Sequence, residues 1–380
     1  MTSYLISDII YIIDEKYIKL EYDTSINYIN TTLRKYSHNI KSEIEDNKNA
    51  WEINKKYSNP YEFINIQFDI NTQPICTYKP LSRSFFKMIE ILNHYNFYFP
   101  NHINSFHLAE GPGGFIEALS YFRKNESDTY YGMTLINNSN DVPKWKKNEI
   151  YLSIHKNIVL EYGKDKTGNL YSKENLLYIY DKYKNSMNFI TGDGGFDYSI
   201  NFNYQEEDSL NLIFSQIIYA ICLQKKNGSF VLKLFDTFTT LSVQFIFLLN
   251  YLYDEIYIIK PVTSRPANSE KYIICKNFRM VNNLDNIIQN ILLNYDNIIN
   301  HKLTNILNID IPIYFFDKIK DINSIIGQSQ IEHIQCILNY ILDKNKKMNL
   351  ENIKQSHIIK CIRWCKKNNL PYKYYENYKI

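Results

Sequence analysis

HLAEGPGGFIEAL, at residues 107–119, combines the end of an apolar strand, a glycine-rich turn and the start of a helix. In α/β sheets, ligands bind at the carboxyl ends of the strands, where such turns lie. Gly113 and Gly114 would let the main chain approach a ligand closely, and the following helix would offer free N–H groups. By itself the pattern also fits a tight turn without a ligand. Its spacing is neither that of a dinucleotide-binding fingerprint nor that of a P-loop.

Outward from this turn, strand-like and helical runs alternate over residues 75–280. The helical runs are 82–95, the residues after Gly114, 207–225 and 239–252. The strand-like runs are FHLAE (106–110), TYYGMTL (129–135), NFITGD (188–193), GSFVLKLF (228–235), EIYIIKP (255–261) and EKYIICK (270–276). This alternation predicts an α/β fold with a Rossmann-like, mostly parallel sheet flanked by helices. The 111–114 loop is expected at the carboxyl end of the first of these strands.

The two flanks differ from this central region. Residues 1–74 mix short apolar runs with polar segments and carry no motif, whereas residues 281–380 space apolar residues at three and four. The latter spacing predicts a mainly helical C-terminal region. We therefore expect an N-terminal extension (1–74), a central domain (75–280) and a helical C-terminal region (281–380).

The composition argues against a strongly basic or acidic protein and against a disordered one. With 43 Lys+Arg against 40 Asp+Glu, the 380-residue chain carries a net charge of only +3, so any basic binding surface must be local. Hydrophobic residues at 45% and charged residues at 22% predict a folded protein. The heavy use of Ile, Asn, Lys and Tyr, all with AT-rich codons, indicates an AT-rich genome, such as that of some large DNA viruses, protists or low-GC bacteria.

Targeting and metal-binding signals are weak. The six cysteines are scattered without a CxxC pair, which favours reduced thiols in a cytosol-like compartment and no metal site. The first twenty residues carry acidic side chains and lack a basic start, so we do not expect a signal peptide. The apolar stretch 241–259 contains Gln244, Asp254 and Glu255 and is interpreted as a buried helix followed by a strand. We expect a soluble protein with no membrane partner.

Three further motifs place chemically useful side chains at strand ends. Asp193 stands in NFITGDGGFD (188–197), where an apolar strand stops and a glycine pair begins, although an Asp-Gly turn would look the same. Lys233 lies inside the apolar run GSFVLKLFDTFT (228–239) and needs a carboxylate partner or a function, unless it lies on an edge strand. Glu270 ends the polar loop of KPVTSRPANSEKYIIC (260–275), where a solvated hairpin glutamate is the alternative.

Taken together, these motifs resemble the FtsJ-like RNA 2'-O-methyltransferases, and especially the cap-specific mRNA enzymes of eukaryotes and their large DNA viruses. LAEGPGGF (108–115), YGMTL (131–135), GDGGFD (192–197), GSFVLKLFDTFT and KPVTSRPANSEKY (260–272) carry the resemblance, which spans roughly residues 80–280. It implies a catalytic Lys-Asp-Lys-Glu tetrad made of Lys87, Asp193, Lys233 and Glu270. Lys87 comes from SRSFFKMIEIL (82–92), whose flanking sequence is generic helix.

The resemblance also implies S-adenosylmethionine as the cofactor. The implied cofactor-binding residues are Glu110, Gly111, Pro112, Gly113, Gly114, Phe115, Asn169 and Asp193. In KDKTGNLY (164–171), Asn169 stands where the family often has an acidic residue, which puts cofactor affinity in doubt. An Asn side chain can still accept and donate hydrogen bonds there.

Methyl transfer to a ribose hydroxyl needs alignment of the nucleophile with the methyl group and removal of the hydroxyl proton. No metal is required. A lysine can be the base only if its pKa falls from about 10.4, which burial and a neighbouring ammonium promote. Asp193 and Glu270 would oppose that fall and would orient the lysines and the ribose.

The implied partner is capped mRNA, with other capping enzymes as further candidates. Two basic clusters surround a tryptophan, which suits phosphate contact plus base stacking, although solvated helix faces explain them equally well. They are Lys144, Lys146 and Lys147 around Trp145, and Lys360, Arg363, Lys366 and Lys367 around Trp364. Methylation of ribosomal or transfer RNA, or a non-catalytic RNA-binding subunit of a capping complex, are the alternatives. The resemblance and the residue usage favour a large DNA virus as the source, with action in the host cytoplasm, a viral factory or virion, or the nucleus.

Overall fold

The computed structural model describes residues 2–6, 12–68, 72–136, 145, 151, 154–196, 202–342 and 347–373. The strands are β1 (Thr2–Ile6), β2 (Ile18–Tyr22), β3 (Asn104–Leu108), β4 (Thr129–Met133), β5 (Ile158–Glu161), β6 (Met187–Gly192), β7 (Gln224–Leu234), β8 (Tyr253–Lys260), β9 (Lys271–Phe278) and β10 (Leu303–Leu307). The α-helices are α1 (Thr31–Asp46), α2 (Lys48–Ser58), α3 (Ser84–His94), α4 (Gly114–Arg123), α6 (Lys173–Tyr183), α7 (Gln205–Leu223), α8 (Thr240–Leu252), α9 (Leu284–Leu293), α10 (Ile313–Leu342) and α11 (Lys347–Lys367).

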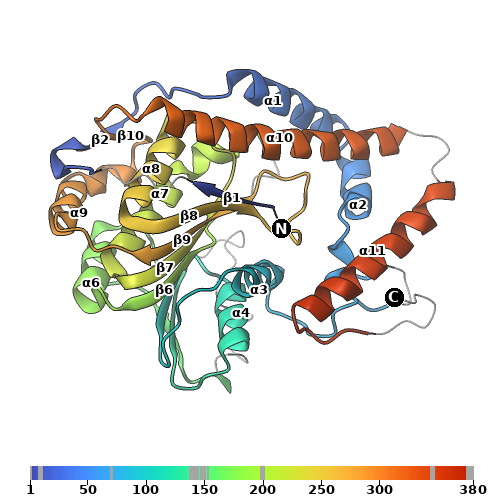
Figure 1. The fold of residues 1–380 in the computed structure, drawn as a ribbon, viewed down its shortest axis with the longest axis horizontal. Coiled ribbons are helices and arrows are strands. Elements are labelled where there is room, and N and C mark those ends of the chain that lie inside the picture. The colour runs from blue at the N-terminus through green and yellow to red at the C-terminus, as the bar shows by residue number, and fades with distance from the viewer. Residues whose placement is uncertain are drawn as a thin grey trace.

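Eight strands form one sheet in the order β1-β8-β9-β7-β6-β3-β4-β5 (Figure 1). β7, β6, β3, β4 and β5 are parallel neighbours, whereas β9 runs antiparallel to both β7 and β8. α4, α6 and α7 connect β3 to β4, β5 to β6 and β6 to β7, as parallel pairing requires. The expected α/β fold with a mostly parallel sheet is confirmed, and the glycine-rich loop lies after β3, at its carboxyl end.

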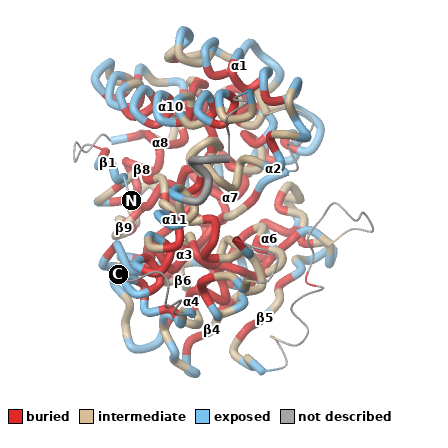
Figure 2. The backbone as a smooth tube through the Cα atoms, turned by 90° about the vertical axis from the view of Figure 1, so that its right-hand side faces the viewer, coloured by how far each residue is buried: buried red, intermediate tan, exposed pale blue. Residues whose placement is uncertain are grey.

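Helices cover both faces of this sheet, with α7 and α8 on one side and α3 and α4 on the other (Figure 1). Side chains of β7 alternate between the two cores: Phe230 and Leu232 pack in one, and Val231 packs in the other. This period of two places Lys233 on the same face as Val231, toward α3. The interior of the sheet region is almost continuously buried (Figure 2).

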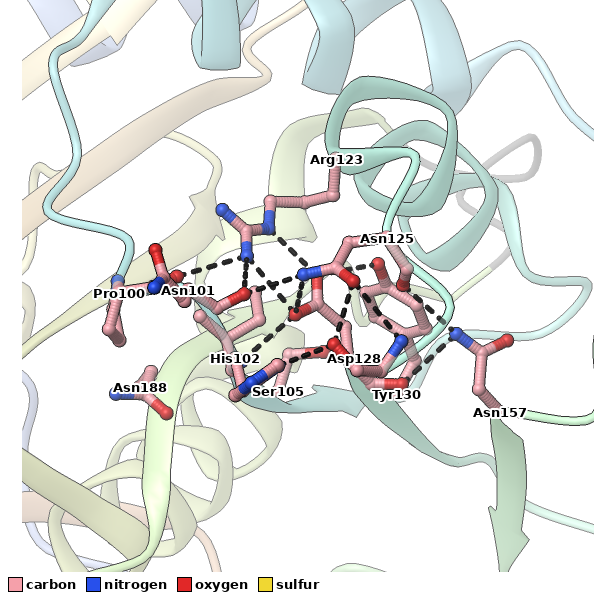
Figure 3. A network of polar contacts seen from close by, with 12 residues as sticks. Pro100, Asn101, His102, Ser105, Arg123, Asn125, Asp128, Tyr130, Asn157 and Asn188 are labelled. Carbon is pink, nitrogen blue, oxygen red and sulfur yellow. Dashed lines mark hydrogen bonds and ion pairs between the residues drawn. The ribbon is translucent and has the colours of Figure 1, made fainter.

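A polar network holds the opposite, amino end of β3 and β4 (Figure 3). Asp128 is buried and accepts hydrogen bonds from the backbone N–H of Ile103 at 3.0 Å, from Arg123 Nε at 2.7 Å and from the hydroxyl of Tyr130 at 3.1 Å. Arg123 also donates to the carbonyl of Pro100 at 3.0 Å. The network joins the end of α4 to both strands and lies away from the glycine-rich loop.

The flanking regions pack on the core and on each other. β1 pairs antiparallel with β8 and lengthens the main sheet, and β2 pairs with β10 in a separate two-stranded sheet. Residues of α1, α2 and α10 form a third apolar cluster around Trp51 and Ile334. The C-terminal region is helical, as expected, but it also contains β10, whose five residues were too short to stand out from the surrounding helical spacing. β5 and α6 were not expected from the sequence.

Within the described residues, no helix is long and apolar enough to cross a membrane.

Candidate active site

The glycine-rich loop is built around the buried carboxylate of Glu110. Ala109 has a φ of 50°, so the chain turns directly after β3, and the Glu110 N–H donates to the carbonyl of Met133 at 3.3 Å. Glu110 Oε1 accepts the backbone N–H groups of Phe115 at 2.6 Å and Ile116 at 3.1 Å. Those first-turn N–H groups were expected to be free for a ligand, and that expectation is wrong, because Glu110 already caps the helix.

Two other residues of the loop serve packing. A Cβ at Gly114 would lie 2.2 Å from the hydroxyls of both Ser82 and Ser84, so this glycine allows α3 to approach α4. The side chain of Phe115 is fully buried and packs against the ring of Tyr272, with ring centroids 6.0 Å apart. In this loop, therefore, the surface available to a ligand comes from the main chain of the 110–113 turn.

Glu110 Oε2 is buried and has no hydrogen-bond partner among the described residues. Burial, and next the nearby charge of Asp193, raises the pKa of Glu110 well above its ordinary value. An unpaired buried carboxylate oxygen is costly, so it marks a position where a polar group of a ligand can bind.

The segment carrying Asn169 lies against the end of β4. The N–H of Ile136 donates to the carbonyl of Thr167 at 2.7 Å, and a Cβ at Gly168 would lie 1.9 Å from the carbonyl of Thr134. The side-chain oxygen of Asn169 accepts the backbone N–H of Tyr171 at 3.0 Å, which leaves its amide N–H groups for other partners. The structure therefore brings this segment to the same sheet edge as Glu110.

Asp193 directly follows β6 and pairs with Lys233 of β7. Lys233 Nζ donates to the Asp193 carbonyl at 2.7 Å and lies 3.3 Å from its Oδ1. The hydroxyl of Tyr272 donates to the same Oδ1 at 3.2 Å. The side chains of Lys233 and Asp193 are 12% and 17% exposed, so both are nearly buried but reachable.

Lys87 of α3 pairs with Glu270, which directly precedes β9. Lys87 Nζ lies 2.7 Å from Oε1 and 2.8 Å from Oε2 of Glu270, and the Ser264 hydroxyl donates to Oε1 at 2.9 Å. Burial acts to raise the pKa of Glu270, but the charges of Lys87 and Lys233 outweigh it and lower the pKa to about 2. Glu270 is therefore ionised at every physiological pH.

The register of β7 and β9 brings the two pairs together. Lys233 is the direct cross-strand partner of Tyr272, two residues after Glu270, and Lys233 acts electrostatically on Glu270. The structure thus gathers all four residues expected for the tetrad at one place, on the face of the sheet covered by α3. Two lysine amino groups alternate there with two carboxylates, an arrangement that can hold a hydroxyl group and, where a lysine is uncharged, accept its proton.

The sequence interpretation missed several residues that support this site. Lys260 Nζ donates to the backbone carbonyls of Asn268 at 2.6 Å and Glu270 at 2.8 Å, which ties the 261–270 loop to the end of β8. Burial is the main cause that lowers the pKa of Lys260 to about 7. Lys260 ends the apolar run EIYIIK (255–260), and a lysine in an apolar run is the same sequence signal that singled out Lys233. No feature of the surrounding sequence indicated Tyr272 or Ser264.

Buried carboxylates clamp the same loop to α3. Glu62 Oε1 lies 2.6 Å from both Arg83 Nη1 and Arg265 Nη2. Glu90, one turn after Lys87, accepts the N–H groups of Val262 at 2.9 Å and Thr263 at 3.2 Å. These bonds fix Glu270 relative to Lys87.

A cavity of about 570 Å³ is lined in part by the 261–270 loop, which ends at Glu270. We call it the α2 cavity. Its wall includes Asn268 and Ser269, directly before Glu270, and it holds both aromatic and charged side chains. These side chains include Lys41, Lys48, Trp51, Glu52, Phe202 and Arg265.

In the two basic clusters expected to contact RNA, the central tryptophans are buried. Lys144, Lys146 and Lys147 lie outside the described residues. Trp145 is 7% exposed and packs on Gly132, and Trp364 is 5% exposed and packs edge-on against Phe86. Neither indole is available for base stacking, so that part of the expectation is wrong.

The sequence profile of the FtsJ-like methyltransferase family matches residues 80–278, just over half of the chain. The cap-specific mRNA (nucleoside-2'-O-)-methyltransferase 1 of Drosophila melanogaster is 28% identical over 354 residues, which cover 88% of this chain and 41% of that protein. The enzyme of the same name from Mus musculus is 34% identical over 181 residues, covering 46% of this chain and 21% of that protein. The chain spans less than half the length of these curated relatives.

Among solved structures, a putative ribosomal RNA methyltransferase from Plasmodium falciparum aligns with a TM-score of 0.37 and 21% identity, covering 52% of this chain and 97% of that one. The family match covers the whole region that contains the glycine-rich loop and the four converging side chains. The chain belongs to the FtsJ-like methyltransferase family.

Proposed function

We propose that this protein transfers a methyl group from S-adenosylmethionine to a ribose 2'-hydroxyl at the 5' end of capped mRNA. The observation that carries the proposal is the convergence of the Lys87–Glu270 and Lys233–Asp193 pairs at one partly exposed point of the sheet. A protein that only binds RNA has no need of two nearly buried lysines between two carboxylates. The cap-specific names of the relatives support the choice of substrate.

The residues at the carboxyl ends of β3 and β4 fit the cofactor. Glu110, the 111–114 turn and the Asn169 segment meet there, and the unpartnered Glu110 Oε2 offers an acceptor to a cofactor N–H or hydroxyl group. When bound, S-adenosylmethionine supplies an electrophilic methyl group on a sulfonium centre. The 110–113 turn and Asn169 would hold it, and Asp193 would lie next to both the cofactor and Lys233.

In this mechanism Lys233 Nζ, in its uncharged form, accepts the proton of the ribose hydroxyl. Asp193 fixes the position of Nζ through its carbonyl and carboxylate oxygens. Lys87, held by the ionised Glu270, supplies a second amino group beside the hydroxyl. The loop clamps at Glu62 and Glu90 keep this geometry in place before the substrate binds.

The α2 cavity supports a capped substrate. A methylated guanine is a flat cation that binds well to aromatic faces such as that of Phe202, and Glu52 can accept its N–H groups. Lys48 and Arg265 can contact the phosphates that link the cap to the first nucleotide. The cavity wall includes Ser269, the residue directly before Glu270, so a nucleotide bound there would place the next ribose near the tetrad.

The test is incubation with labelled S-adenosylmethionine and matched capped and uncapped RNAs, followed by nuclease mapping of the methylated nucleotide. We expect a 2'-O-methyl group at the capped end, with little transfer to the uncapped RNA. Equal transfer to uncapped structured RNA would favour a ribosomal or transfer RNA enzyme. No transfer to any RNA would favour a non-catalytic subunit. Partnership with other capping enzymes, a viral source and the cellular compartment stay predictions.

A further inference from the structure

A second cavity, of about 320 Å³, meets the 261–270 loop at Val262. We call it the α11 cavity. Lys360, Arg363 and Lys367 of α11 line it, together with His94 and Glu90 of α3 and Val262 of the loop. The three cationic residues follow one another at three and four positions, so they share one face of the helix.

The charge of this cavity is strongly positive. Lys360, Arg363 and Lys367 are exposed, and they form no ion pair with any other described residue. Glu90 is the opposing charge, and its two oxygens already accept the Val262 and Thr263 N–H groups. Cations gathered around a hollow without carboxylate partners leave an anion-binding site.

A second observation points to a ligand in the same place. Trp364 lines the cavity, is only 5% exposed, and its indole N–H has no hydrogen-bond partner among the described residues. His94 adds a further donor, and burial holds its pKa below its usual range, so it is uncharged at neutral pH. Indole, imidazole, guanidinium and ammonium groups together suit the oxygen atoms of a phosphate.

The position of the cavity identifies which phosphate. The α2 cavity touches Asn268 and Ser269, the tetrad contains Glu270, and the α11 cavity touches Val262, so the three sites are arranged along one loop. His94 is seven residues after Lys87 on α3, which corresponds to about 10 Å along the helix. An RNA strand with its first nucleotide at the tetrad can therefore reach the α11 cavity with its following backbone.

We infer that the α11 cavity binds backbone phosphates of the RNA on the 3' side of the methylated nucleotide. The inference rests on the proposed function in one respect, that RNA is the substrate. Because the contact is to phosphate, it is independent of base sequence, and it acts only on RNAs long enough to reach the cavity.

The test compares Lys360→Gln/Arg363→Gln/Lys367→Gln in the full chain with Lys366→Gln, which removes an exposed charge of the same helix outside the cavity. We expect the triple variant to bind a long capped RNA about ten-fold more weakly, with a salt dependence whose slope is shallower by about 2. Lys366→Gln should bind like the unmodified protein. The affinity for a capped dinucleotide should not change in either variant.

Binding is measured by fluorescence anisotropy, which needs no methyl transfer, and the unfolding temperature shows that each variant is folded. Arg363→Gln alone should weaken binding of the long RNA about two- to three-fold. Unchanged affinity in the triple variant, or an equal loss in Lys366→Gln, would overturn the inference. A labelled acidic peptide is measured in the same way. If the triple variant lost affinity for this peptide but not for the RNA, the inference would be overturned, because the cavity would then bind a protein partner. If the RNA binding follows our expectation but no methyl group is transferred, the proposed function fails and the inference stands.

Discussion

At the scale of single residues, Lys233 shows how an apolar strand can carry a reactive group. Its side chain is 12% exposed, and it meets both the carbonyl and the carboxylate of Asp193. A lysine held in this way keeps one defined position, which is what proton removal from an aligned hydroxyl needs.

We predict that Lys233→Ala lowers the methylation rate by about 10²-fold or more, because it removes the proposed base. Lys233→Arg should not restore the rate, since a guanidinium group does not lose its proton at neutral pH. Single-turnover assays measure the rate, and calorimetry should show nearly unchanged S-adenosylmethionine binding. Lys226→Ala, on the exposed start of the same strand, is the matched control. Near-normal methylation by folded Lys233→Ala would show that another group removes the proton.

Glu62 is a residue whose charge contributes to stability. Burial acts to raise its pKa, but hydrogen bonds and charges from Arg265 and Arg83 lower the pKa to about 2. A carboxylate with a lowered pKa stabilises the folded state above its unfolded value of about 4.3, and that contribution is lost as the pH falls toward 2.

We predict that Glu62→Gln lowers the free energy of unfolding by about 3 kcal/mol at pH 7, because two arginines lose their partner. The difference from the unmodified protein should shrink between about pH 4.3 and 2, where Glu62 itself becomes protonated. Denaturant titrations over this pH range measure it, with the exposed Glu45→Gln as control. A difference that stays constant with pH would contradict the assigned ionisation.

At the scale of secondary-structure elements, the two ends of the sheet have separate tasks. The carboxyl ends of β3, β6 and β7 carry the candidate site, whereas the amino ends of β3 and β4 carry the Asp128 network (Figure 3). Such a division lets stability and catalysis be altered independently.

We predict that Asp128→Asn lowers the free energy of unfolding by about 3 kcal/mol, because it breaks a buried ion pair with Arg123 and weakens three further hydrogen bonds. The folded variant should still bind S-adenosylmethionine and RNA normally, since the network is at the far edge of the sheet. Chemical denaturation and binding assays measure the two properties. Glu126→Gln, an exposed change in the same loop, should alter neither. Loss of binding without loss of stability would mean that the two edges are coupled.

At the scale of the whole molecule, the N-terminal helices are joined to the sheet by a buried ion pair. Lys41 of α1 lies 2.7 Å from Asp236, just after β7, and their side chains are 3% and 11% exposed. Burial acts to raise the pKa of Asp236, but the charges of Lys41 and Lys271 lower it. The N-terminal extension therefore supplies the positive charge that compensates the buried carboxylate of Asp236 at the end of β7.

We predict that Lys41→Met lowers the free energy of unfolding of the whole chain by about 3 to 5 kcal/mol, because it leaves Asp236 buried without its closest partner. Lys35→Met, an exposed change on the same helix, should have almost no effect. Far-ultraviolet circular dichroism during denaturation measures both. A loss of less than about 1 kcal/mol in Lys41→Met would show that the pair behaves like a solvent-exposed one.

Most elements of the central region, and the candidate site residues, could be predicted from the amino-acid sequence. Period-two and period-3.6 spacing is local, and it located β3, β4, β6, β7, β8 and β9, together with α3, α4, α7 and α8, to within a few residues. Lys233 stood out because a charged group inside an apolar run is costly without a partner. Asp193 and Glu270 lie at strand ends, and their roles came from the resemblance. Short elements such as β5 and β10 escaped, since four or five residues define no period.

How these residues meet depends on long-range packing, which local sequence patterns do not reveal. The pairing of Lys233 with Tyr272 is set by the register of β7 and β9, and strand register depends on contacts across the whole sheet. The capping of α4 by Glu110 and the burial of Trp364 likewise depend on what packs around them. Both cavities are built from segments far apart in the chain, so no local pattern could reveal them. A charged residue in an apolar segment can be recognised from the sequence, because the free-energy cost of burying it follows from its immediate neighbours. Its interaction partners and the cavities around it depend on long-range packing.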